Sequence, residues 1–228
     1  SIFNAKQNSN NLVIEMGAAK PGDIKYLSSI LKPNIGVITN IGNSHLEKLK
    51  NIKGVLKVKS ELVSNIKNGG YLVAPNENKE HLKFWKKIIR GKELITFGTE
   101  KNADFYAINI KSSIKKQEFN IISDKYNIDH KIKTSLSGVH NIKNILAAFA
   151  VSYLIENSPK LFNQRLEKDV QVRQKQQKWI RGSLLIDDTY NANPESVKKA
   201  IDFLSNSIKR KVFIMGDMLE LGRYRKKM

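Results

Sequence analysis

An apolar strand, a polar loop and the start of a helix follow one another in Ile186-Asp187-Asp188-Thr189-Tyr190-Asn191-Ala192-Asn193-Pro194-Glu195-Ser196. The apolar run that ends at Ile186 is typical of a buried strand, and Pro194 suits the first position of a helix. Asn193 is placed to cap that helix. The polar residues therefore follow the carboxyl end of a strand, where open α/β sheets bind their ligands. A well-capped turn that binds nothing is the alternative interpretation.

The first hundred residues alternate between strand-like and helix-like patterns. Amphipathic patterns predict helices over residues 24–31, 52–66 and 81–89, and apolar runs predict strands over residues 12–15, 35–39, 71–74 and 94–97. This alternation is typical of βαβ units and therefore predicts a parallel sheet.

The pattern changes after residue 104. Short alternating segments over residues 104–134 predict a small antiparallel insertion. A long helix is expected next, with a buried face made by Ile142, Leu146, Phe149, Ala150 and Tyr153. Residues 167–178 are rich in Gln, Lys and Arg, and we interpret them as a helix end followed by a linker.

A second unit is expected from about residue 181, with a strand over 184–186, a helix over 194–204 and a strand over 212–215. Two strands cannot close a doubly wound domain, so this unit is expected to be incomplete. The sequence thus predicts an α/β protein with a mostly parallel, ATPase-like central domain (residues 1–180) that carries the antiparallel insertion. The start of a Rossmann-like α/β domain (residues 181–228) follows it.

The composition excludes several classes of protein. No apolar run approaches the about 20 residues of a membrane span, and residues 1–11 are polar and lack a signal-peptide core. The absence of cysteine excludes disulfides, thiolate metal sites and a cysteine nucleophile. We therefore expect a cytoplasmic protein without a membrane partner, and a monomer.

The chain is strongly basic, with 40 Lys and Arg against 21 Asp and Glu and a formal charge of +19. The lysines are spread over nearly every segment, so we expect no specific nucleic-acid partner. A non-catalytic basic module that binds nucleic acid or anionic surfaces is the alternative.

Two residues near predicted strand ends could hold a metal ion. Glu15 closes the first predicted strand and precedes Gly17, so its carboxylate could hold Mg²⁺ beside a phosphate. His45 follows the second predicted strand, and it would face the same cleft if the two strands are adjacent. An ordinary strand-end acid and a solvated histidine are the alternatives.

Lys59 is the unusual lysine of its predicted helix, because it shares an apolar stripe with Val55, Leu62 and Ile66. Burying an ammonium group is costly. Such a lysine extends to solvent, finds an anion, or has its pKa lowered enough to react as a free amine.

His140, Asn141 and Asn144 open the long predicted helix after Gly138. Asn141 and Asn144 are three residues apart and share a face, where carboxamides can offer a donor and an acceptor to a purine. Helix capping is an alternative for Asn141 but not for Asn144. The sequence has no Gly-x-x-x-x-Gly-Lys-Ser/Thr motif, so it lacks a phosphate-cradling loop of its own.

Six tracts together resemble the Mur ligases in order and spacing. They are Glu15-Met16-Gly17-Ala18, Asn40-Ile41-Gly42-Asn43-Ser44-His45-Leu46-Glu47, Lys59-Ser60-Glu61, His140-Asn141-Ile142-Lys143-Asn144, Asp187-Asp188-Thr189-Tyr190-Asn191-Ala192-Asn193-Pro194 and Gly216-Asp217-Met218-Leu219-Glu220-Leu221-Gly222. The Tyr-Asn-Ala-Asn-Pro and Gly-Asp-Met-Leu-Glu-Leu-Gly tracts most resemble the members that add D-alanyl-D-alanine.

The resemblance implies an ATP-dependent amide ligase that adds D-alanyl-D-alanine to UDP-N-acetylmuramoyl-tripeptide through an acyl phosphate, in peptidoglycan precursor synthesis. Another amino-acid ligase of the same family is the alternative. By position, Glu15 and His45 match the family's Mg²⁺ ligands. Lys59 matches a lysine that is carbamylated and suits a second Mg²⁺, so Lys59 and His45 are the expected catalytic residues.

The resemblance also implies a nucleotide site. Asn141 and Asn144 match residues around the adenine of ATP, with His140 beside them, and Asp188 matches the acid that holds the ribose. Tyr190, Asn191 and Asp187 are expected neighbours.

The chain also departs from the family pattern. The family's phosphate-binding loop and UDP-sugar domain lie upstream of the position of Glu15, and its C-terminal domain continues beyond the second strand. We therefore expect a fragment with little or no ligase activity on its own. The surroundings of Arg173 match poorly, so we do not assign it as the family's phosphate-contacting arginine.

Overall fold

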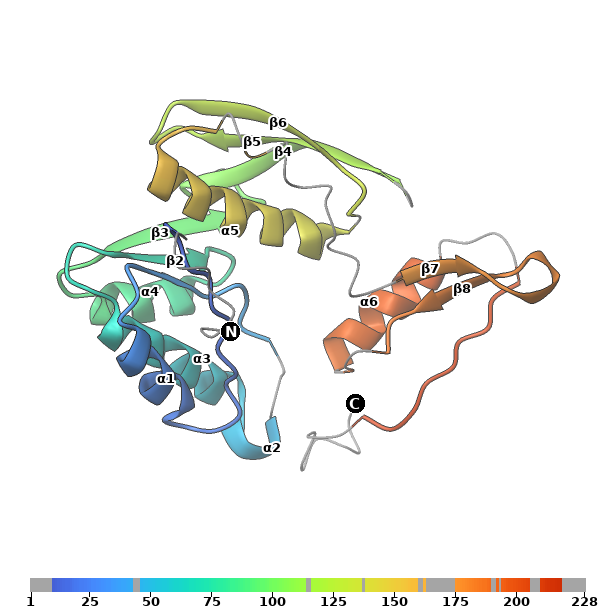
Figure 1. Cartoon of the computed structure of the whole chain (residues 1–228), viewed down its shortest axis with the longest axis horizontal. Helices are drawn as coiled ribbons and strands as arrows, with labels where there is room; N and C mark the ends of the chain where they lie inside the picture. The colour runs from blue at the N-terminus through green and yellow to red at the C-terminus, as the bar shows by residue number, and fades with distance from the viewer. Residues whose placement is uncertain are drawn as a thin grey trace.

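A computed structural model describes residues 10–42, 46–113, 116–136, 138–159, 162, 175–189, 192, 194–205 and 210–218. Figure 1 shows a larger part built on a six-stranded sheet and a smaller part built on a two-stranded sheet. In the ranges that the structure covers, no helix is both long and apolar enough to cross a membrane.

The first half of the large sheet is parallel, as predicted, with β2 between β1 and β3. The predicted helix over 52–66 ends at residue 60 and continues as a 3-10 helix. In chain order the elements are α1 (Asp23–Leu31), β1 (Ile35–Val37), α2 (Leu46–Leu49), α3 (Ile52–Ser60), η2 (Glu61–Asn65), β2 (Tyr71–Pro75), α4 (Lys79–Ile88) and β3 (Glu93–Gly98).

The second half of the large sheet is the predicted antiparallel insertion, formed by β4 (Phe105–Ser112), β5 (Gln117–Ser123) and β6 (Ile128–Thr134). It is continuous with the parallel half, because β4 pairs in parallel with β3 through Phe97–Phe105 and Gly98–Tyr106. The insertion therefore extends the same sheet instead of forming a separate one.

The long predicted helix is α5 (Val139–Glu156), and it covers one face of the sheet (Figure 1). Side chains alternate between the faces of a strand, so Val73 of β2 packs with α5 while its neighbours Leu72 and Ala74 pack with α1, α3 and α4. The parallel half is thus covered on both faces.

The smaller part contains β7 (Lys175–Lys178), the 3-10 helix η4 (Ile180–Gly182), β8 (Leu184–Asp187) and α6 (Pro194–Ser205). It confirms the predicted strand at 184–186 and the helix start at Pro194, whereas Asn193 lies outside the described residues. The predicted linker over 167–178 is wrong at its end, because residues 175–178 pair with β8 as an antiparallel strand. Residues 175–178 are polar and therefore give no strand signal in the sequence, because an edge strand needs no apolar run.

Two predicted strands are not formed. Residues 11–18 and 211–218 have no regular secondary structure, and Val13 and Ile214 are 90% and 89% exposed. A strand persists only where a neighbouring backbone accepts and donates its hydrogen bonds. The described partner of β1 is β2 and that of β8 is β7, so neither apolar run gains a ladder here.

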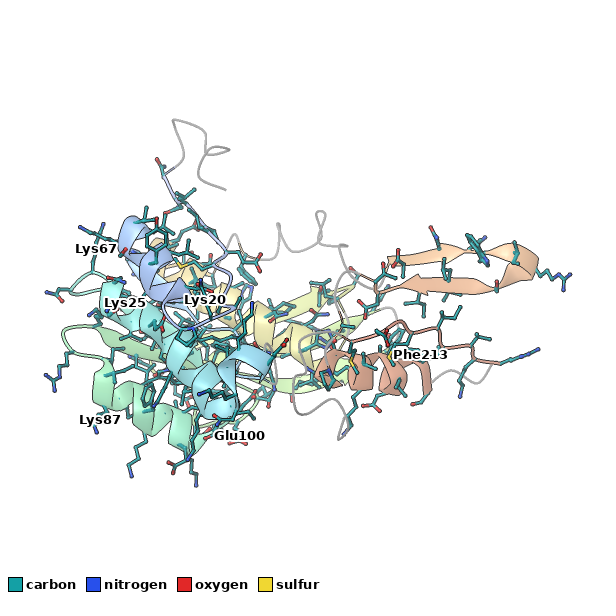
Figure 2. The ribbon with its side chains drawn as sticks, turned by 90° about the horizontal axis from the view of Figure 1, so that it is seen from below. Lys20, Lys25, Lys67, Lys87, Glu100 and Phe213 are labelled. Carbon is teal, nitrogen blue, oxygen red and sulfur yellow. The ribbon has the colours of Figure 1, made fainter. Side chains whose placement is uncertain are left out.

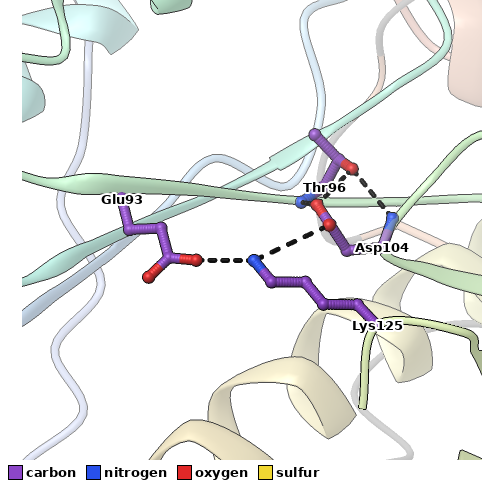
Figure 3. A network of polar contacts seen from close by, with 4 residues as sticks. All are labelled: Glu93, Thr96, Asp104 and Lys125. Atoms are coloured by element: carbon purple, nitrogen blue, oxygen red, sulfur yellow. Dashed lines mark hydrogen bonds and ion pairs between the residues drawn. The ribbon is translucent and has the colours of Figure 1, made fainter. Parts of the chain in front are cut away.

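A polar network reinforces the short junction between the two halves of the large sheet (Figure 3). Oδ2 of Asp104 accepts hydrogen bonds from the backbone N–H (2.7 Å) and the hydroxyl (2.6 Å) of Thr96, and Oγ1 of Thr96 accepts from the N–H of Asp104 (2.9 Å). Lys125, in the β5–β6 turn, donates to Glu93 (2.5 Å) and lies 3.9 Å from Asp104.

The network also sets the charge state of its lysine. Burial alone would lower the pKa of Lys125, but the hydrogen bond to Glu93 and the nearby negative charges of Asp104 and Glu93 raise it overall. Lys125 therefore stays positively charged between the two acids.

We predict that Asp104→Ala lowers the free energy of unfolding by about 1–3 kcal/mol, because it leaves the N–H of Thr96 without its acceptor. Asp129→Ala is the matched control. It removes a carboxylate that accepts an exposed hydrogen bond from Asn120 on the same sheet, and its cost should stay within about 0.5 kcal/mol. Urea unfolding measures the free energy of unfolding of both variants. Equal losses of stability would contradict the role of Asp104 at the junction.

Gly54 allows the close approach of α3 to α2. A Cβ at this position would lie 1.9 Å from the carbonyl oxygen of Leu49, which is backbone and cannot move aside cheaply. We therefore predict that Gly54→Ala destabilises the fold by at least about 1–3 kcal/mol in thermal or urea unfolding. Gly17→Ala is the control, because nothing lies within 4 Å of a Cβ there. If Gly54→Ala left the stability unchanged, the close approach of α2 and α3 at this position would be contradicted.

Candidate functional site

The candidate site lies along the carboxyl ends of β1 and β2, where two pairs of side chains join segments that are far apart in the sequence. Asn40 follows β1 and receives the side chain of Lys59 from α3. Glu77 follows β2 and forms a 2.5 Å ion pair with Lys143 on the second turn of α5. Lys59 and the start of α5 thus each contact a residue that follows one of two neighbouring parallel strands, and open α/β sheets bind their ligands at this edge.

Lys59 lies on the apolar stripe that the sequence predicts. Val55, Leu62 and Ile66 are buried, and the Lys59 side chain is partly exposed at the edge of this cluster. Its ammonium donates to the backbone carbonyl oxygen (2.9 Å) and to Oδ1 (3.2 Å) of Asn40. Lys59 therefore extends from the apolar stripe to its exposed edge, where neutral amide oxygens at the strand end accept its hydrogen bonds.

The described residues contain only part of the expected metal site. Glu15 is exposed in the irregular segment 11–18, and His45 lies outside the described residues. Among the residues described, no group of three or more His, Cys, Asp or Glu side chains is arranged to hold a metal ion. Of the expected donors, the Glu15 carboxylate and a lysine carbamate offer the oxygen ligands that suit Mg²⁺. Lys59 suits the cation only as the carbamate, because an ammonium would repel it.

The first turns of α5 carry His140, Asn141 and Asn144. Gly138 occupies the N-cap with φ 94, so Asn141 is not the N-cap residue of this helix. A Cβ at Gly138 would lie 2.7 Å from Cε1 of His140, so the glycine lets the imidazole fold back over the helix start. Asn141 is partly exposed and Asn144 is exposed.

The acidic loop after β8 is only partly described. Asp188 is partly exposed at the strand end, whereas Tyr190 and Asn191 lie outside the described residues. Oδ1 of Asp187 accepts hydrogen bonds from the N–H (3.1 Å) and hydroxyl (2.7 Å) of Thr189, an Asx-type turn. Asp187 therefore shapes the loop that carries Asp188.

Sequence reasoning missed Asn76 and Glu77, which directly follow β2. Asn76 is buried, and its Nδ2 donates to Oδ1 of Asn102 at 2.7 Å. Its Oδ1 has no hydrogen-bond partner among the described residues. The signal was present, because polar residues directly after a buried strand occupy the same edge as Asn40.

The basic surface is built from lysines on separate elements. Figure 2 labels Lys25 on α1, Lys67 after η2 and Lys87 on α4, and all three are exposed. Such a distribution agrees with the scattered lysines of the sequence and gives diffuse attraction to anions.

Comparisons with known families cover nearly the whole chain. Residues 1–152 match the Mur ligase middle domain. Residues 170–228 match the Mur ligase, glutamate ligase domain.

Several relatives are named UDP-N-acetylmuramoyl-tripeptide--D-alanyl-D-alanine ligase. The chain is 33% identical to that of Buchnera aphidicola subsp. Baizongia pistaciae over 98% of this chain and 48% of the relative. It is 32% identical to that of Escherichia coli over 92% of this chain and 46% of the relative. The chain thus spans about half the length of the curated relatives it matches.

Solved structures agree with the sequence comparison. MurF from Acinetobacter baumannii superposes with a TM-score of 0.85 at 28% identity, over 94% of this chain and 47% of that one. MurF ligase from Thermotoga maritima, solved in complex with ADP, gives a TM-score of 0.75 at 25% identity over 93% and 48% of the two chains. With a family match over residues 1–152 of its 228 residues, the chain belongs to the Mur ligase family.

Proposed function

We propose that this chain forms the central and early C-terminal part of an ATP-dependent ligase that joins D-alanyl-D-alanine to UDP-N-acetylmuramoyl-tripeptide in peptidoglycan precursor synthesis. The observation that carries the proposal is that Lys59 binds Asn40 after β1 and the start of α5 pairs with Glu77 after β2, in a chain several of whose relatives bear that enzyme's name. The proposed domains are residues 1–180 and 181–228, in a cytoplasmic, monomeric enzyme without a nucleic-acid partner.

In the proposed reaction the terminal carboxylate of the tripeptide attacks the γ-phosphate of ATP, and ADP leaves. The amine of D-alanyl-D-alanine then attacks the acyl carbon and forms the amide C–N bond. The nitrogen loses a proton, and the C–O bond to phosphate breaks so that phosphate leaves. Positioning and charge neutralisation supply most of the rate. Two Mg²⁺ ions held by Glu15, His45 and carbamylated Lys59 would neutralise phosphate charge.

The start of α5 would hold the nucleotide. Asn141 and Asn144 can each donate to and accept from the adenine edge, and His140 lies beside them. Asp188, in the second domain, would accept from the ribose hydroxyls, with Tyr190 and Asn191 as neighbours. In this proposal one domain binds the adenine and the other binds the ribose.

Lys59 reacts with CO₂ only as a neutral amine, which forms an N–C bond and loses one proton to give the carbamate. The carbamate nitrogen keeps one hydrogen. One of the two contacts with Asn40 can therefore persist after modification, and the new carboxylate oxygens become available to a cation. Asn40 would in this way hold Lys59 in both forms.

We test the function in a chimera in which this chain replaces the matching segment of the Escherichia coli relative. We expect phosphate release that depends on D-alanyl-D-alanine, and a fall of at least about 100-fold for Lys59→Ala, because oriented charge stabilisation is lost. The isolated chain should not turn over. Preference for a single amino acid such as L-alanine would instead assign another ligase of the family.

We also predict that Asn144→Ala in the same chimera weakens ADP binding by about 1–3 kcal/mol, the cost of losing a paired polar contact. Calorimetric titration with ADP measures this change. Ser152→Ala, farther along α5, is the control and should bind ADP as the unmodified chimera does. Equal affinity of Asn144→Ala would place the adenine elsewhere.

A further inference from the structure

Glu61 caps a helix that is distant in the sequence. Its Oε1 accepts a hydrogen bond from the N–H of Gly22 (2.9 Å), and its Oε2 accepts from the N–H of Lys25 (3.0 Å). These are backbone groups at the start of α1, where Gly22 is the N-cap and has no side chain to cap the helix itself. A carboxylate is well suited to this place because it also faces the positive end of the helix dipole.

Glu61 belongs to a run of three residues that each contact a different element. Lys59 donates to Asn40 after β1, and Oγ of Ser60 accepts from the indole N–H of the fully buried Trp85 of α4 at 2.8 Å. Glu61 reaches α1. The end of α3 is therefore fixed on three sides, and the backbone at Lys59 is fixed with it.

The loop held by Glu61 is the one that begins at Glu15. Met16 and Ala18 pack against the apolar cluster to which Val55 of α3 and Leu62 of η2 also belong. Farther along, Oδ2 of Asp23 accepts from the N–H groups of Ala19 (3.1 Å) and Lys20 (2.9 Å). The loop ends at Gly22, in the left-handed region at φ 91, where Glu61 binds.

We infer that Glu61 is a positioning residue for the metal centre, because it ties the loop of Glu15 to the segment of Lys59. The inference rests on the proposed function, in which Glu15 and Lys59 share Mg²⁺. Glu61 acts through backbone N–H groups and does not touch the ion. It ties the irregular segment that carries Glu15 to the end of α3 that carries Lys59, and preorganised ligands bind a cation more tightly than mobile ones.

A purely structural cap is the competing explanation, and Asn65 offers the matched control. Asn65 also lies in η2 and also contacts α1, through Nδ2 to the carbonyl oxygen of Lys25 (3.0 Å) and to Oγ of Ser28 (2.9 Å). Its contacts are on the far side of the cap from the Glu15 loop. Asn65→Ala should therefore loosen the same helix pair without releasing that loop.

The experiment measures two properties of the 228-residue chain and its variants Glu61→Gln, Glu61→Ala and Asn65→Ala. Hydrogen exchange reports the amides of residues 16–25. Electron paramagnetic resonance titration with Mn²⁺, in bicarbonate buffer, reports the cation affinity. Urea unfolding identifies the variants that keep the fold. If Glu61→Ala does not keep the fold, Glu61→Gln provides the milder substitution.

We expect Glu61→Gln to exchange faster at residues 16–25 and to bind Mn²⁺ about tenfold more weakly, as when outer partners of metal ligands are removed. Asn65→Ala should bind Mn²⁺ as the unmodified chain does, even at a similar loss of stability. Unchanged exchange in Glu61→Gln, or a Mn²⁺ affinity that falls equally in both variants, would overturn the inference.

Failure of the proposed function gives a different pattern. If the unmodified chain binds Mn²⁺ with the same affinity as Glu15→Gln and Lys59→Met, the metal centre is not at these residues and the positioning role falls with it. Faster exchange in Glu61→Gln would then still show the tie between the two segments. A metal site that responds to Glu15→Gln and Lys59→Met but not to Glu61→Gln would overturn only the role of Glu61.

Discussion

The packing of α5 against a single continuous sheet is the constraint on which the rest of the larger part depends. Ile142, Leu146 and Phe149 are buried against strands of both halves, so this one helix face joins the parallel and the antiparallel strands. Direct pairing between the halves is limited to two residue pairs of β3 and β4. Because α5 is fixed by this burial, its start is held close to the carboxyl end of β2, where Lys143 pairs with Glu77.

Polar contacts then set positions that apolar burial leaves free. Burial of a stripe specifies which face of a helix turns inward but not how far the helix slides along it. The Thr96–Asp104 hydrogen bonds fix the start of β4 against β3, and the Trp85–Ser60 bond fixes α4 against the end of α3. The ion pair between Lys143 and Glu77 does the same for α5 and β2. Each contact lies close to a chain segment that the proposed site uses.

Local periodicity in the sequence predicts most of the elements. The helices at 24–31, 81–89 and 194–204 and the strands at 71–74 and 94–97 occur within a residue or two of their predicted bounds. The runs at 12–15 and 212–215 carry the same signal and form no strand, because a ladder needs a second backbone and local pattern carries no information about it. Residues 175–178 show the converse, a polar segment that becomes a strand because β8 is beside it.

The candidate site likewise contains residues that the sequence predicts and residues that it does not. The stripe of Val55, Leu62 and Ile66 identifies Lys59 from sequence, because an ammonium on a buried face is costly wherever the helix packs. Glu61 has no such local signal, since an exposed-looking acid at a helix end is ordinary. Its partners lie 39 and 36 residues away, and Gly22 shows its need for an external cap only when its backbone conformation is known. Spacing thus reveals residues whose environment is unfavourable, whereas residues that fix one loop against another become visible only when the chain is folded.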